Sequence, residues 1–170
     1  MGFWGTFVTC RTDSALTDLR AIAMRSEGLD YQWRTKNGWQ VGQYDRLELG
    51  DDAPAMLADL AAETGHPTLC AFVLDSDAIQ IDGFSENGHW RACLARESMR
   101  DYCEDDDEDF DFVFLPPETA VKQAARWSDN AGYGPNLVGL RAVFSTEEAV
   151  SAAEDLFFEL LEHLGPGQLR

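Results

Sequence analysis

Three strand-length segments within residues 68–95 restrict the possible folds of this chain more than any other feature. The first, 68–74, is a continuous apolar run, and the two that follow alternate between apolar and polar side chains. Short turns rich in Asp, Ser, Asn and Gly separate them, which is typical of strands that pair with their neighbours in sequence. The segments therefore predict an antiparallel meander, with Trp90, Ala92 and Leu94 on its core-facing side.

Further elements surround this meander. Apolar strand-length patterns predict strands at residues 3–10 and 38–44, and the first of these is apolar on both faces, as expected for a buried strand. Helical spacing of apolar residues, with Pro near the start and Gly near the end, predicts helices at 51–65 and 116–132. Strands dominate the first 95 residues and helices dominate the rest, so we expect one α+β domain over residues 1–170.

Local start signals predict two more helices. Ser14 is a candidate N-cap for a short helix, and residues 145–148 (STEE) have the pattern of a capping box. The long helix predicted after this box places Val150 and Leu160 on one apolar face. Residues 25–37 are polar and irregular, and no element is expected there.

The net charge of −18 excludes several classes of partner. Residues 1–50 hold six acidic and six basic residues, so the remaining 120 residues hold 25 acids against seven bases. Such a charge repels nucleic acids and anionic membranes, and it attracts basic proteins and cations. We therefore expect no nucleic-acid partner and no membrane partner, and a basic protein is the candidate partner.

Cysteine usage and the absence of targeting features give the expected compartment. No stretch approaches the roughly 20 consecutive apolar residues of a membrane-spanning helix, and the first residues have no basic region followed by a long apolar run. The four cysteines include no CxxC pair. We therefore expect a cytoplasmic protein with four free thiols, of which Cys70 is buried.

The run of acids at residues 104–109 is the least ordinary feature of the chain. Adjacent like charges repel one another, so an exposed loop is expected. One interpretation is a solvated loop that only aids solubility. The other is a docking surface for a basic partner, with Phe112 adding apolar contact. The candidate partner-binding residues are Asp105, Asp106, Asp107, Glu108, Asp109 and, as the apolar anchor, Phe110.

No catalytic residue, metal site or cofactor is predicted. Asp107, Asp109, Asp111 and Glu118 fall at calcium-loop positions 1, 3, 5 and 12, but position 6 is a Phe where the sharp turn requires Gly. His89 and Cys93 share a strand face about 13 Å apart, which is too far for one zinc ion. Signature motifs for nucleophilic catalysis and for nucleotide binding are absent from the sequence.

Three short stretches resemble a family of small acidic bacterial proteins. They are the opening residues 1–5 (MGFWG), residues 74–77 (LDSD) and residues 155–158 (DLFF). The resemblance implies a bacterial source, and the high content of Ala, Asp, Arg and Gly fits a GC-rich genome. It implies no activity.

The leading hypothesis is a non-enzymatic acidic protein that binds and inhibits a basic protein, in the manner of an immunity protein. This role requires only a rigid scaffold and a complementary field. A first alternative is a small enzyme or ligand-binding domain whose site lies between the sheet and the helices. A second alternative is a scaffold subunit that forms a homodimer through an apolar surface.

Overall fold

A six-stranded sheet, antiparallel at every pairing, organises the molecule in the order β2-β3-β1-β4-β5-β6. The computed structural model describes residues 1–103 and 107–167, except for the side chains of residues 107 and 108. The strands are β1 (Gly5–Arg11), β2 (Tyr31–Arg34), β3 (Trp39–Tyr44), β4 (Thr68–Leu74), β5 (Ala78–Ser85) and β6 (Gly88–Leu94).

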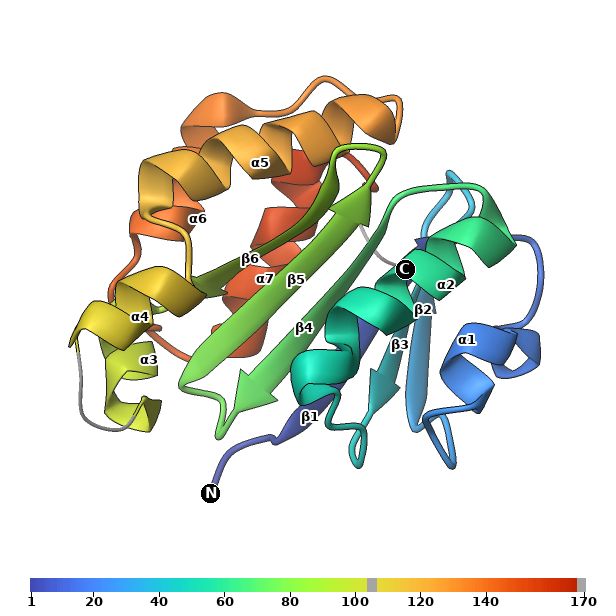
Figure 1. Ribbon diagram of the computed structural model, residues 1–170, viewed down its shortest axis with the longest axis horizontal. Coiled ribbons are helices and arrows are strands. Elements are labelled where there is room, and N and C mark those ends of the chain that lie inside the picture. Colours follow the sequence, from blue (N-terminus) through green and yellow to red (C-terminus); the bar gives the residue numbers. More distant parts are fainter. Residues whose placement is uncertain (104–106, 168–170) are drawn as a thin grey trace.

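Helices cover both faces of this sheet (Figure 1). The α-helices are α1 (Arg20–Ala23), α2 (Ala53–Thr64), α3 (Arg96–Tyr102), α4 (Asp107–Val113), α5 (Pro117–Asn130), α6 (Leu137–Ser145) and α7 (Ala153–Leu164). Two 3-10 turns, η1 (Leu16–Asp18) and η2 (Gly50–Asp52), precede α1 and α2. Helices α1 and α2 lie on one face, α5, α6 and α7 lie on the other, and α3 and α4 lie at one end of β5 and β6. The α+β architecture is as the sequence predicts.

The predicted meander is confirmed as β4, β5 and β6. Leu74 pairs with Ala78 across the first turn, and Ser85 pairs with Gly88 across the second. Trp90, Ala92 and Leu94 are all buried in the larger core, as the alternation predicts. This half of the sheet is therefore encoded locally, in the strand patterns and the turns between them.

The larger core lies between the sheet and helices α5 to α7, and aromatic residues dominate it. Phe7 of β1 stacks on Phe157 of α7 with ring centroids 5.0 Å apart. Trp39 and Trp127 are fully buried, and both indole N–H groups have partners. The indole of Trp39 donates to the hydroxyl of Tyr133 at 2.8 Å, and that of Trp127 donates to the carbonyl of Thr68 at 2.9 Å. These hydrogen bonds remove the cost of burying indole nitrogen.

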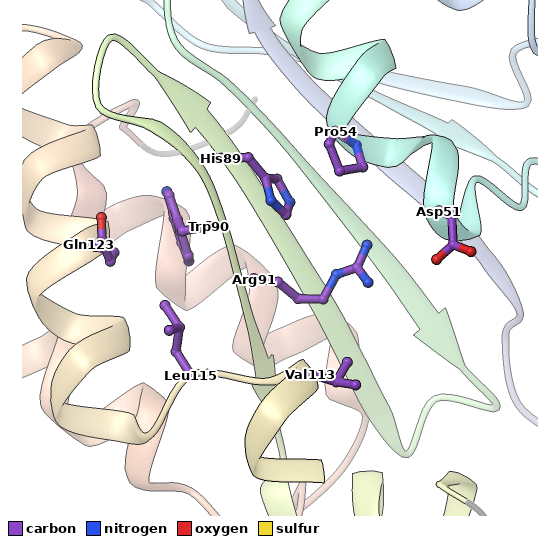
Figure 2. Close-up of a pocket in the computed structure, with 8 residues that line it drawn as sticks. All are labelled: Asp51, Pro54, His89, Trp90, Arg91, Val113, Leu115 and Gln123. Atoms are coloured by element: carbon purple, nitrogen blue, oxygen red, sulfur yellow. The ribbon is translucent and has the colours of Figure 1, made fainter. Parts of the chain in front are cut away.

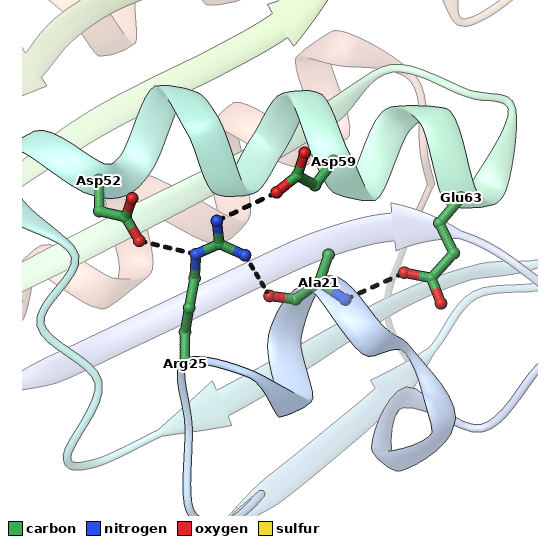
Figure 3. A network of polar contacts seen from close by, with 5 residues as sticks. All are labelled: Ala21, Arg25, Asp52, Asp59 and Glu63. Atoms are coloured by element: carbon green, nitrogen blue, oxygen red, sulfur yellow. Dashed lines mark hydrogen bonds and ion pairs between the residues drawn. The ribbon is translucent and has the colours of Figure 1, made fainter.

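The smaller core lies under α1 and α2, and a polar network holds these two helices together (Figure 3). The guanidinium of Arg25 donates to Asp52 at 2.7 Å and to Asp59 at 3.0 Å. It also donates to the carbonyl of Ala21 at 2.9 Å, and Glu63 accepts from the Ala21 N–H at 3.0 Å. Because α1 is only four residues long, these contacts and the packing, rather than its own hydrogen bonds, must stabilise it.

Outside the acidic run, three predicted features of secondary structure differ from the structure. Ser14 caps no helix, because η1 precedes α1. The capping box at residues 145–148 does not form, since Ser145 ends α6 and α7 begins only at Ala153. Strand β2 lies in the stretch predicted to be irregular.

The displaced start of α7 has a physical reason. The carbonyls of Thr146 and Glu147 accept hydrogen bonds from the first turn of α3, and the N–H of Ala153 donates to Ser76 at 2.8 Å. The backbone that a helix would have used is therefore bonded to other elements. Val150, predicted on the buried face, is fully exposed.

Candidate functional site

The acidic run is only partly described by the structure. Residues 104–106, with Asp105 and Asp106, lie outside the described residues, and so do the side chains of Asp107 and Glu108. From residue 107 onward the chain forms α4, so the prediction of an exposed loop is wrong for this part. Phe110 and Phe114, one helical turn apart, give α4 a buried apolar side, which explains the helix.

Phe110 does not have the exposed position that was predicted for an apolar anchor. Its side chain is only 2% exposed and packs against Phe114 with ring centroids 5.1 Å apart. The guanidinium groups of Arg96 and Arg100 lie 4.7 Å and 4.3 Å from its ring centroid, within the range of cation–π attraction. Exposed apolar surface on α4 comes instead from Phe112, which is 91% exposed. Asp109 is exposed, as predicted.

An exposed aromatic pair lies close to the start of the acidic run. Trp4 is 44% exposed, and its ring meets that of Tyr102, the last residue of α3, edge to face at 5.9 Å. The Tyr102 hydroxyl donates to Asp77 at 3.0 Å. Partial burial, this hydrogen bond and the charges of Asp77, Asp75 and Asp101 raise the pKa of Tyr102. We call the surface formed by Trp4, Tyr102, Asp75, Asp77 and Asp101 the acidic–aromatic surface.

The β4–β5 turn holds this surface in place. Asp75 and Ser76 both have positive φ angles, 51° and 58°, which is unusual for residues other than glycine. In this conformation Asp75 Oδ1 accepts from the N–H of Gly2 at 2.6 Å, and Ser76 Oγ accepts from the N–H of Phe3 at 2.8 Å. The turn thereby fixes the chain just before Trp4. Sequence reasoning noted the turn but had no signal that would pair it with the N-terminal segment.

A groove with a polar floor lies between the N-terminal end of α2, strand β6 and the chain that follows α4 (Figure 2). Its volume is about 340 Å³. The residues that line it are Asp51, Pro54, His89, Trp90, Arg91, Val113, Leu115 and Gln123. The backbone N–H of Leu115 donates to the carbonyl of Arg91 at 3.0 Å, which attaches the wall after α4 to the edge strand.

A buried carboxylate lies beneath this groove. Asp82 of β5 is 1% exposed, and Oδ1 accepts from Arg91 Nε at 2.8 Å and lies 2.6 Å from His89 Nε2. Its second oxygen accepts from Gln80 Nε2 at 2.9 Å. Asp82 and Arg91 are direct cross-strand partners, and His89 lies two residues before Arg91 on the same face. Alternation along the β5–β6 hairpin contained this signal, and the sequence analysis missed it.

A second hollow of about 580 Å³ lies further along α2. Small and apolar residues of α2, the β5–β6 turn and the end of α5 form most of its wall. Its lining residues are Ala58, Ala61, Ala62, Gly65, His66, Pro67, Phe84, Ser85, Glu86, Gly88 and Asn130. Its polar lining side chains include His66, Ser85 and Asn130, and none of the described residues that line it carries a guanidinium group.

Comparisons of the chain with protein-family models, with curated proteins and with solved structures find no match. Within the described residues, no group of three or more His, Cys, Asp or Glu side chains could hold a metal ion. None of the described helices is long and apolar enough to cross a membrane. The four cysteines are free thiols, and Cys70 is buried, as predicted.

Proposed function

We propose that the protein is a non-enzymatic acidic binding protein that docks on a basic protein and inhibits it, in the manner of an immunity protein. The observation that carries this proposal is the acidic–aromatic surface. There, the exposed carboxylates of Asp77 and Asp101 and the partly exposed carboxylate of Asp75 lie near the aromatic pair of Trp4 and Tyr102. The acidic run begins at residue 104, two residues after Tyr102 in the sequence.

The chemistry of this surface suits Lys and Arg side chains. A carboxylate satisfies the charge of an ammonium or guanidinium group, and an aromatic face adds cation–π attraction. Aromatic residues are also enriched among the residues that dominate binding energy at interfaces. Trp4 belongs to the acidic–aromatic surface, Phe112 follows the acidic run on α4, and both are exposed. In this proposal they replace Phe110 as apolar anchors.

The overall charge supports the same partner class. The acids outside residues 1–50 exceed the bases by 18, so the field is concentrated away from the N-terminal segment. Complementary fields raise association rates and discriminate against wrong partners more than they raise affinity. A basic protein should therefore associate with this protein rapidly, and salt should slow the association.

Two charge-matched variants test the proposal. The first replaces five acids of the run by amides, at Asp105, Asp106, Asp107, Glu108 and Asp109. The control replaces five acids from residues 1–50, at Asp13, Asp18, Glu27, Asp45 and Glu48. Both variants lose five negative charges, so a partner held only by net charge would respond equally to both.

The measurement is capture of partners from the native host at low salt, followed by association kinetics with each partner identified. The run variant should lose the partner or associate at least about tenfold more slowly, while the control should stay within about threefold of wild type. Trp4→Ala should shorten the lifetime of the complex. Equal behaviour of the two charge variants, or no captured basic protein with wild type, would refute the proposal.

A further inference from the structure

The groove above Asp82 differs in its chemistry from the acidic–aromatic surface, and the proposed function does not involve it. Its floor comes from β6, and its walls come from the N-terminal end of α2 and from the chain around Leu115 (Figure 2). The groove contains both an imidazole and a guanidinium group, although the protein carries a net charge of −18.

Asp82 itself is not available to a ligand. It is almost fully buried, and Gln80, His89 and Arg91 already contact its two oxygens. Because protein groups already hydrogen-bond to the Asp82 carboxylate, it would not bind a cation in the groove. Asp82 is therefore a positioning residue, which fixes the orientation of His89 and Arg91.

Arg91 has hydrogen-bond donors left over. Its guanidinium carries five N–H groups. Within the described residues, Nε donates to Asp82 and Nη2 donates to the carbonyl of Gly50 at a long 3.3 Å. The side chain is 18% exposed, and Figure 2 shows the guanidinium directed along the groove toward Asp51. The remaining N–H groups have no hydrogen-bond acceptor among the described residues, so they can donate to the oxygens of a ligand that displaces water from the groove.

His89 has one ring nitrogen free for a ligand. Beside the guanidinium of Arg91, Asp82 acts as an acceptor, so Nε2 of His89 carries the proton of their 2.6 Å contact. Nδ1 has no hydrogen-bond partner among the residues that the structure describes. It accepts a hydrogen bond when the ring is neutral and donates one when the ring is protonated. The His89 side chain is 28% exposed, so a ligand can reach it.

We propose that this groove binds the oxyanion group of a small molecule, a carboxylate or a phosphate, through Arg91 and His89. Nδ1 of His89 donates to an oxyanion only when it carries a proton. With both ring nitrogens protonated, the charges of His89 and Arg91 would balance those of Asp82 and one bound monoanion. Pro54 on one wall and Val113 and Leu115 on the other offer apolar surface for the rest of the ligand.

The other charged groups near His89 set the expected direction of each substitution. Asp51 of η2 lies on the rim and repels an anion, whereas Arg91 and the protonated ring attract it. Glu86 and His66 line the neighbouring hollow. Removing the charge of Asp51 should therefore tighten binding, while removing the imidazole of His89 should weaken it.

Benzoate and benzamide are matched probes, because both have an apolar ring and only benzoate carries the oxyanion. Inorganic phosphate is the third probe, and comparing it with benzoate shows whether the groove binds a phosphate or a carboxylate. Binding is followed by calorimetry and by the imidazole resonances of His89. Benzoate or phosphate should bind saturably, and benzamide at least about tenfold more weakly, since hydrogen bonds to charged groups contribute that much.

Two variants and a control complete the test. Asp51→Asn should bind the oxyanion more tightly, and His89→Gln should bind it more weakly. His66→Gln is the control and should leave the affinity unchanged. A general loss of folding would weaken binding in both variants. It cannot explain tighter binding by Asp51→Asn together with weaker binding by His89→Gln. The proposal is overturned if neither oxyanion shifts the His89 resonances at about 10 mM, where even a millimolar Kd is visible. It is also overturned if benzamide binds as well as benzoate.

Discussion

At the scale of single residues, the loss of the Asp82 carboxylate should destabilise the protein most. Asp82→Asn keeps the shape of the side chain but leaves the largely buried Arg91 without its counter-charge. Breaking such a pair and its charged hydrogen bonds should lower the free energy of unfolding by about 2–4 kcal/mol. Urea melts at neutral pH measure the loss. Asp52→Asn, which breaks an ion pair whose carboxylate is 54% exposed, is the control and should cost less than about 1 kcal/mol. Equal losses would mean that the Asp82 pairing contributes no more than a surface pair.

The cysteines give a second prediction at this scale. Burial raises the pKa of Cys10 and Cys93 to about 12 and that of Cys70 well above its usual value, so all three remain protonated thiols near neutral pH. Only Cys103 is partly exposed. Since the thiolate is the nucleophile, a disulfide reagent should modify one thiol rapidly in the native protein and four in denaturant. Cys103→Ser should abolish the rapid phase. Rapid modification of a second thiol would contradict the packing described for the other three.

At the scale of elements, the sequence correctly predicted the strands and helices whose residue pattern has one dominant local cause. Strands β4 to β6 follow from alternation and turn chemistry, and α2 follows from a Pro in its first turn and a left-handed Gly65 at its end. Strand β2 was missed because an edge strand with exposed side chains has no buried face to create a pattern. The capping box failed because distant elements bind the same backbone, and no local pattern contains that information.

Helix α7 allows the sequence-based and the observed helix starts to be compared by experiment. Leu160 is fully buried, so Leu160→Ala should cost about 2–5 kcal/mol through lost burial and cavity formation. Val150 lies three residues before α7 and is fully exposed, so Val150→Ala should change stability by less than about 0.5 kcal/mol. Urea midpoints of the two variants are the measurement. A loss above about 1 kcal/mol for Val150→Ala would favour a helix that begins at the capping box.

At the scale of the whole molecule, net charge was the property that the sequence showed most clearly, and the candidate sites were the least predictable. The acidic–aromatic surface joins residues near positions 4, 75 and 102, and the groove joins η2, β6 and the chain after α4. Contacts over such separations depend on strand order and helix docking, which a single sequence does not contain. The Asp82 network is different, because its members lie within one hairpin and alternate on one face.

The same net charge predicts how salt should affect stability. Acids outnumber bases by 18, so there are too few bases to pair with every carboxylate, and repulsion among the acids destabilises the compact state. The screening length falls from about 10 Å at 0.1 M salt to about 3 Å at 1 M, which removes most of this repulsion. Sodium chloride should therefore raise the thermal midpoint over this range. A variant with Asp105, Asp106, Asp107, Glu108 and Asp109 replaced by amides should start from a higher midpoint at low salt and gain less from added salt. A lower midpoint in added salt would contradict this prediction. It would mean that attractive ion pairs, such as those of Arg25 with Asp52 and Asp59, contribute more to stability than the repulsion among the acids costs.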